Sequence, residues 1–288
     1  MLAIYKRELK SYFQSMVGCV FIAFLVAFTG IYFMAYNLTA GYPYFSYTLS
    51  GSLIVFLVGI PLLTMRSFSE ERRNKTDQLL LTAPVSLWQI ALGKYLAIVT
   101  VIAVPNVIFC AFPLVIQAQG TAYLTVDYIS IGVFFLLGCV YAAIGMFLSA
   151  LTESQIIAFI STFGILLVLY LWDGLLAMIP SSAVSGLVGI LIILTLIVFY
   201  IHNMTGNAVL SGAIEVIGIA AGVIVYIVDS SLFENLLTNW FGKLALANIF
   251  TDITSNSIVD VTGIVLYLSI IAVFVFLTIQ AIQKRRWS

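Results

Sequence analysis

The chain has 288 residues, of which 62% are hydrophobic and 8% are charged, and its formal net charge is zero. Soluble domains are about 45–50% apolar and about 25% charged. This composition, with a mean hydropathy of +1.15, therefore excludes an ordinary soluble protein and predicts an all-α integral membrane protein. A neutral chain offers no basic surface to nucleic acid, so no nucleic-acid partner is expected.

The first predicted element is an amphipathic helix over residues 2–16. Its apolar residues recur at spacings of three and four and are Leu2, Tyr5, Leu9, Tyr12, Phe13 and Met16, opposite Lys6, Arg7, Lys10 and Gln14. Such a helix lies in the plane of the membrane interface. The alternative is a connector whose apolar side packs on the helix bundle. The apolar run that follows is too long for the core of a cleavable signal peptide.

Eight predominantly apolar segments are long enough to approach the roughly 20 residues that a membrane-spanning helix needs. They are 17–37, 47–65, 95–117, 128–150, 155–172, 186–201, 208–228 and 261–282. Six spans would also be consistent with the chain if 174–228 formed a re-entrant or buried hairpin. Eight are favoured because 208–228 is long enough to cross. Before the last span, residues 233–244 repeat the amphipathic pattern, as an interfacial helix or a packed connector.

The basic residues are distributed unevenly between the two predicted sides of the membrane. With eight spans, eleven of the twelve lie on the side of the N-terminus, and only Lys243 lies on the other. Cytoplasmic segments carry the excess of lysine and arginine. We therefore expect both termini, and the loop between the second and third spans, to be cytoplasmic.

That loop, residues 66–89, concentrates charge in a chain that otherwise has little. Six ionisable residues fall within eight positions, namely Glu70, Glu71, Arg72, Arg73, Lys75 and Asp77, and a more apolar stretch follows from Leu79 to Trp88. A helix starting near Ser69 would carry its acids in the first turn, where the helix dipole favours them, and would end at Pro84. The pattern describes a docking element and a solvated loop equally well.

The run MRSFSEERRNKTDQLLLTAPVSLWQIALGKYLA, residues 65–97, resembles the signature of permease subunits of ABC-2 type ATP-binding cassette transporters. It is most similar to the branch with the gliding-motility and nitrous-oxide-maturation permeases. The matching residues are Ser69, Glu70, Glu71, Thr76, Leu79, Leu80, Thr82, Ala83, Pro84, Val85, Ser86, Gly93 and Lys94. The chain departs at Lys75, where glycine is usual, and at 77–78, where Leu-Glu is usual. Residues 151–160 and 276–288 also resemble the family.

The resemblance implies a single transmembrane domain over 1–288. Residues 1–16 would form an elbow helix, 66–89 a loop with a coupling helix, 180–228 a pair of spans beyond the commoner six, and 229–259 an outer re-entrant segment. The coupling helix would insert into a separate ATPase through Glu70, Glu71, Arg72, Arg73, Thr76, Leu79, Leu80, Thr82 and Pro84. Further partners would be a second permease chain and the lipids of a bacterial cytoplasmic membrane.

The chain has no G-x-x-x-x-G-K-[ST] motif, so we expect no cofactor in it and expect ATP and magnesium to bind the partner ATPase. Its cysteines lie in apolar runs and suggest hydrophobic fillers rather than metal ligands. Small residues recur on 138–149 and as G-x-x-x-G at Gly218 and Gly222. They favour close packing between helices of the same chain over a subunit contact.

Glu215 is the carboxylate that lies well inside a predicted span. A lone charge there costs about 2.5–3.5 kcal/mol on insertion scales. Glu215 therefore either lines a transport path or is interfacial, if the span starts near Ile214.

Three classes of function are consistent with these spans: a permease, a secondary transporter or channel, and an intramembrane enzyme. A secondary transporter usually carries paired intramembrane ionisable groups or broken helices. An intramembrane enzyme needs a polar catalytic cluster that the sequence does not display. The favoured function is the permease of an exporter for a hydrophobic or amphipathic substrate, such as a lipid, peptide or drug; a secondary transporter or channel is the alternative.

Overall fold

The computed structural model describes residues 1–76, 85–178, 180, 182–206, 208–242, 245–256 and 261–287. These residues contain helices and no strand. The chain divides into two compact units, one of Met1–Tyr170 with Leu246–Ser288 and the other of Leu171–Ala245. The predicted polytopic helical fold is confirmed.

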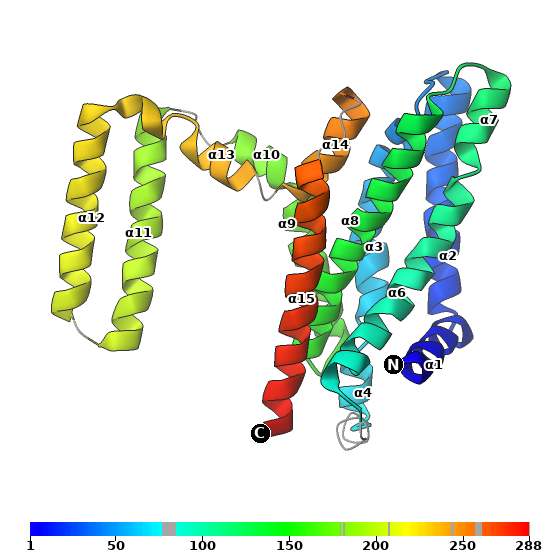
Figure 1. The fold of residues 1–288 in the computed structure, drawn as a ribbon, viewed down its shortest axis with the longest axis horizontal. Helices are drawn as coiled ribbons and strands as arrows, with labels where there is room; N and C mark the ends of the chain where they lie inside the picture. The colour runs from blue at the N-terminus through cyan, green and yellow to red at the C-terminus, as the bar shows by residue number, and fades with distance from the viewer. Residues whose placement is uncertain are drawn as a thin grey trace. The chain divides into compact units, whose positions relative to one another are not determined.

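The first unit begins with helix α1 (Leu2–Gln14), which runs across the end of α2 (Val17–Phe33), as Figure 1 shows. A π-helical turn, η1 (Met34–Thr39), extends α2, and α3 (Ser46–Thr64) returns antiparallel to it. The short helix α4 (Ser69–Arg73) follows at the same end of the unit as α1. The remaining helices of this unit are α6 (Leu87–Phe109), α7 (Phe112–Gln119), α8 (Leu124–Leu151), α9 (Gln155–Tyr170), α14 (Leu246–Asn256) and α15 (Val261–Trp287).

Helix α8 forms the centre of this unit and packs against α3, α6, α9 and α15. The rings of Phe56 and Phe134 lie 4.5 Å apart between centroids, and both side chains are fully buried. Gly138 has Phe56 against it, and Gly145 lies directly against α3 and α9 at Thr64 and Thr162. The small residues of α8 therefore serve packing within the chain, as the sequence indicates, because they let neighbouring helices approach closely.

Helix α8 also holds both ends of α3. At one end the buried carboxylate of Asp127 accepts a hydrogen bond from the backbone N–H of Phe45 at 2.8 Å, immediately before α3 begins. At the other end the hydroxyl of Ser149 donates to the carbonyl of Met65 at 3.1 Å, where α3 has just ended. Free N–H and C=O groups at helix ends need such partners.

Seven helices among the described residues are long and apolar enough to cross a membrane. They are Val17–Thr39, Ser46–Arg73, Leu87–Gln119, Leu124–Leu151, Ala183–Asn203, Ser211–Val228 and Val261–Lys284. The predicted span 155–172 forms the shorter helix Gln155–Tyr170. Its 16 residues extend only about 24 Å at 1.5 Å per residue, against a hydrocarbon core of about 30 Å.

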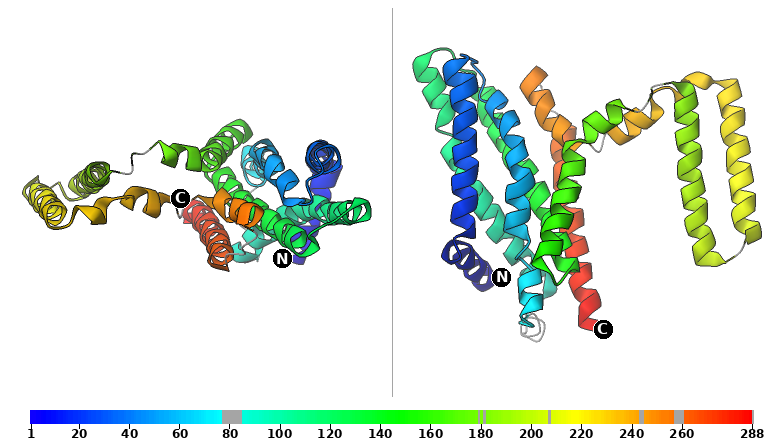
Figure 2. Two further views of the ribbon diagram at one scale, coloured as in Figure 1. Left: turned by 90° about the horizontal axis from the view of Figure 1, so that it is seen from above. Right: turned by 180° about the vertical axis from the view of Figure 1, so that it is seen from behind.

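The second unit contains α10 (Trp172–Ala177), α11 (Ala183–Thr205), α12 (Ala208–Val228), η2 (Ser230–Phe233) and α13 (Leu236–Gly242). Helices α11 and α12 run side by side as an antiparallel pair, drawn in yellow-green and yellow in Figure 2. Gly206 ends α11 with φ of 64°, a left-handed conformation that suits glycine. Gly218 packs on Leu194 of α11, and Gly222 has Leu191 at 3.7 Å. The G-x-x-x-G motif is therefore used inside this pair.

The amphipathic segment 233–244 packs its apolar side within the second unit. Phe233 lies against Gly186, and Leu237 lies against Gly189, both on α11. Trp240 on α13 is exposed, and Leu244 lies outside the described residues. The packed connector is thus the better account of Phe233 and Leu237.

Candidate functional site

Helix α1 packs one side of its apolar stripe on the rest of the first unit. The hydroxyl of Tyr12 donates to the carbonyl of Leu63 at 3.1 Å, and the hydroxyls of Tyr5 and Thr100 lie 3.0 Å apart. Burial raises the pKa of Tyr12 far above its ordinary value, so its hydroxyl stays a donor. Leu2 and Phe13 remain 67% and 41% exposed. The packed-connector alternative therefore describes the part of the stripe that holds Tyr5 and Tyr12, and the interfacial position of the helix stays a prediction.

The corner between α3 and α4 is built around one serine from α8. The oxygen of Ser149 accepts hydrogen bonds from the backbone N–H groups of Phe68 and Ser69, both at 3.2 Å. These groups stand at the start of α4, where N–H groups lack partners within the helix. The helix therefore begins at Ser69, as predicted, with Glu70 and Glu71 in its first turn.

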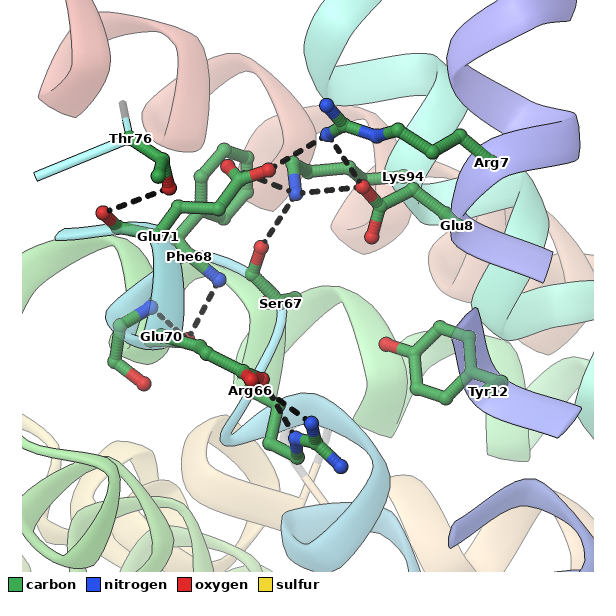
Figure 3. A network of polar contacts seen from close by, with 12 residues as sticks. Arg7, Glu8, Tyr12, Arg66, Ser67, Phe68, Glu70, Glu71, Thr76 and Lys94 are labelled. Carbon is green, nitrogen blue, oxygen red and sulfur yellow. Dashed lines mark hydrogen bonds and ion pairs between the residues drawn. The ribbon is translucent and has the colours of Figure 1, made fainter. Parts of the chain in front are cut away.

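Lys94 of α6 is the buried centre of the site, with 1% of its side chain exposed. Its ammonium donates to the carbonyl of Ser67 at 2.7 Å and pairs with Glu71 at 3.0 Å and Glu8 at 3.2 Å (Figure 3). The ammonium also lies 5.1 Å from the centre of the Phe68 ring. An ammonium has three donors, and here three oxygens surround it, so the cost of burying its charge is offset.

Arg7 of α1 links the same two acids from the outside. One guanidinium nitrogen lies 2.8 Å from Glu8 and 2.7 Å from Glu71. Partial burial lowers the pKa of Arg7, but its hydrogen bonds and charge interactions with Glu8 and Glu71 raise it by more, so the net shift is upward. Two acids and two bases thus form a neutral group, which we call the α1–α4–α6 network: Arg7, Glu8, Glu71 and Lys94.

A polar cavity of about 540 Å³ lies beside this network. Its walls are α1, α4 with the preceding corner, and the first part of α6. Arg66 lines it and holds Glu70 through two parallel hydrogen bonds of 2.6 and 2.9 Å, and Asn74 and Thr76 also line it. The cavity therefore carries both signs of charge, from Arg66 and Glu70 as well as from the network.

The predicted coupling residues have different surroundings. Glu70 and Glu71 are both paired within the chain. Arg72 is buried, whereas Arg73 and Thr76 are exposed. The remaining four predicted coupling residues, Leu79, Leu80, Thr82 and Pro84, lie outside the described residues.

The prediction that the helix starting at Ser69 continues to Pro84 is wrong, because α4 ends at Arg73. Lys75 follows with φ of 56°. This left-handed conformation is easy for glycine and unfavourable for a residue with a Cβ. It explains why glycine is usual here in the signature that the segment resembles.

The sequence reading missed three members of the network: Arg7, Glu8 and Lys94. The available signal was the Gly93-Lys94 pair in the resemblance. A Cβ on Gly93 would meet Ile4 of α1 at 3.2 Å, so glycine at this position lets α1 approach α6. The lysine beside it is then covered by α1 and α4.

The second candidate, Glu215, lies in the other unit on α12 and is half-buried. Nearer the turn, His202 of α11 contacts Ser211 of α12, with Nδ1 and Oγ 3.2 Å apart. Leu194 of α11 faces Gly218 of α12, farther from the turn than the contact between His202 and Ser211. Glu215 lies between these two contacts along α12, four residues or about one helical turn past Ser211. The apolar stretch that could cross starts at Ser211, so Glu215 lies about 6 Å inside it at 1.5 Å per residue.

The comparisons with known proteins give one family. Residues 52–278 match the family model described as ABC-2 family transporter protein. This match covers more than half of the chain and includes Glu71 and Lys94, while α1 with Arg7 and Glu8 precedes it. No curated protein and no solved structure matches the chain.

Proposed function

The chain belongs to the ABC-2 family of transporter proteins, and we propose that its α1–α4–α6 network is where a separate ATPase drives the membrane-spanning helices. Membership makes the protein a membrane permease subunit with several spans. The partner ATPase, the direction of transport and the substrate belong to the proposal. The observation that carries it is the burial of Lys94 between acids from two other segments.

The network offers a short mechanical route. Segment 66–89 joins α3 to α6 directly, and α4 within it is bonded to α8 through Ser149 and to α6 through Lys94. Glu8 extends the route to α1. A partner that displaces α4 would therefore displace α3 through the chain, and α1, α6 and α8 through polar contacts that are mostly shielded from water, where such contacts are stronger.

The contacts also divide the predicted coupling residues by role. Glu70 and Glu71 pair with Arg66, Arg7 and Lys94, so we assign them to holding the corner together. We assign the surface offered to the ATPase to Arg73 and Thr76, which are exposed, and, from the sequence alone, to Leu79, Leu80, Thr82 and Pro84. Apolar anchors at the centre of an interface carry most of its binding energy, and charges at the rim mainly affect association rate.

The wider assignment follows from the charge distribution and the exposed apolar helices. The excess of basic residues supports a cytoplasmic position for the corner and both termini. We assign the permease to a bacterial cell membrane. The permease would work with a second permease chain and would export a hydrophobic or amphipathic substrate. ATP and magnesium would bind the ATPase, which supplies the hydrolysis.

Copurification tests this function. The tagged chain is purified in mild detergent, and the nucleotide-binding protein that accompanies it is identified and quantified. Replacing residues 77–83 with a Gly/Ser linker of equal length should abolish that association while the permease remains folded and membrane-inserted. A Gly/Ser replacement of 118–122, at the opposite end of the first unit (Figure 1), should leave the association intact.

Two outcomes would contradict the proposal. An ATPase that still binds the 77–83 variant would show that this segment is not the docking element. A chain that transports cargo with no ATPase bound would be a secondary transporter or channel, the alternative that the sequence leaves open.

A further inference from the structure

Helix α1 leaves part of its apolar stripe unused by the first unit. Leu2 and Phe13 are 67% and 41% exposed, and Met16, two residues after the end of the helix, is also exposed. At 100° per residue, Leu2 and Phe13 lie on nearly the same line along the helix. Aligned apolar side chains that are exposed to water do not stabilise a protein. Their alignment therefore indicates a face that another molecule covers.

Two lysines border this apolar line. Lys6 and Lys10 lie on the flank of the helix next to Leu2 and Phe13, and both are exposed. Neither forms an ion pair with any group that the structure describes. Their neighbour Arg7, by contrast, is engaged with Glu8 and Glu71. The lysines are therefore free to bind an external anion.

The position of α1 identifies what covers this face. Only Ser15 and Met16 separate α1 from α2, a candidate membrane span, and α1 runs across the end of that span (Figure 1). A helix held there lies at the depth of the lipid headgroups. Apolar side chains beside lysines at that depth match the acyl chains and the phosphate layer of an anionic leaflet.

We propose that α1 binds anionic phospholipids through Lys6 and Lys10, with Leu2 and Phe13 inserted among the acyl chains, and that this contact stabilises the α1–α4–α6 network. The opposite flank of the same helix carries Arg7 and Glu8, which contact Glu71 and Lys94. One rigid helix therefore joins the membrane surface to the coupling corner. The effect on coupling rests on the proposed function, whereas lipid binding does not.

The first experiment measures lipid binding by the permease without any ATPase. Purified protein in neutral detergent is titrated with phosphatidylglycerol or phosphatidylcholine, and bound lipid is counted by native mass spectrometry. Each lysine near an anionic surface contributes about 1 kcal/mol, a factor of about five. The K6Q/K10Q variant should therefore lose roughly 25-fold in preference for phosphatidylglycerol.

The matched control is K75Q/K284Q, which removes the same charge from two exposed lysines of the same unit. It should change the preference by less than about threefold, because neither lysine borders the apolar line of α1. An equal loss in both double variants would mean that net charge alone attracts the lipid. No loss in K6Q/K10Q would overturn the proposed site directly.

The second experiment addresses coupling in nanodiscs that contain the permease and its ATPase. Replacing neutral lipid with about 30% phosphatidylglycerol should raise ATP turnover for the unaltered chain, and K6Q/K10Q should abolish that dependence. Turnover that ignores lipid charge, with lipid binding intact, would overturn the coupling step alone. Loss of ATPase copurification in K6Q/K10Q, with unchanged lipid binding, would make this face a protein-docking surface and refute the proposal.

Discussion

Replacing Lys94 with methionine keeps the apolar part of the side chain at nearly the same length and removes the ammonium with its charge. Glu8 and Glu71 would then face each other with Arg7 as their remaining basic partner, and their side chains are only 13% and 17% exposed. Removing one partner of a buried ion pair typically costs about 3–5 kcal/mol, because the other charge stays buried without compensation. Arg7 still pairs with both acids here, so we expect a loss near the lower limit, about 3 kcal/mol.

The assay is thermal unfolding of the purified permease in one detergent at fixed pH. With a shift of roughly 2–4 °C per kcal/mol for chains of this size, K94M should lower Tm by about 6–12 °C. The double variant K94M/E71Q removes the uncompensated carboxylate and should recover part of that loss. The pairwise coupling is obtained from a double-mutant cycle with E71Q alone.

The outcome that would refute this reasoning is specific. If K94M unfolds within about 2 °C of the unaltered chain, Lys94 does not hold α1 and α4 to α6. If K94M is destabilised but E71Q gives no recovery, the loss comes from packing around Phe68 or from the carbonyl of Ser67, not from the acids. A charge-preserving K94R serves as the control for geometry, since a guanidinium fork does not reproduce three ammonium donors.

Four further variants test other contacts. Ser149→Ala should lower the free energy of unfolding by about 1–3 kcal/mol, because two buried backbone N–H groups lose their acceptor; equal melting curves would contradict the capping role. Lys75→Gly should raise it by up to about 1 kcal/mol by relieving the positive φ, whereas Lys75→Ala should give no gain. Gly218→Leu should lower thermal stability by disrupting the α11–α12 pair at Leu194, and normal stability would show that the pair readily shifts apart. Glu215→Gln should reduce transport at normal expression if this carboxylate lines the path, and unchanged transport would favour an interfacial position.

Hydropathy along the sequence locates seven of the eight predicted spans, because twenty uncharged residues have few alternatives to a membrane helix. The G-x-x-x-G spacing likewise indicates close packing, and Gly218 provides it against Leu194. Segment 155–172 is the exception. Its helix stops at Tyr170, which leaves it short for a crossing although its composition is apolar throughout.

The site was harder to predict because its partners are distant in sequence. Arg66 and Glu70 are only four residues apart, so their pairing across the corner between α3 and α4 is a local contact. Glu71 meets Arg7 and Lys94 across 64 and 23 positions, and no local pattern encodes such contacts. From the sequence we therefore predicted that the charges of α4 contact an external partner. In the structure its two acids, Glu70 and Glu71, are paired within the chain.

The two polar contacts between α3 and α8 limit how these helices can move. Asp127 holds the beginning of α3 and Ser149 holds the chain just beyond its end, so sliding one helix along the other would break buried hydrogen bonds at both ends. Each buried group left without a partner costs about 1–3 kcal/mol. Translation between them is therefore unfavourable, and we expect the two helices to move together as one rigid body. A force applied at α4 would then tilt α3 and α8 together rather than slide one along the other.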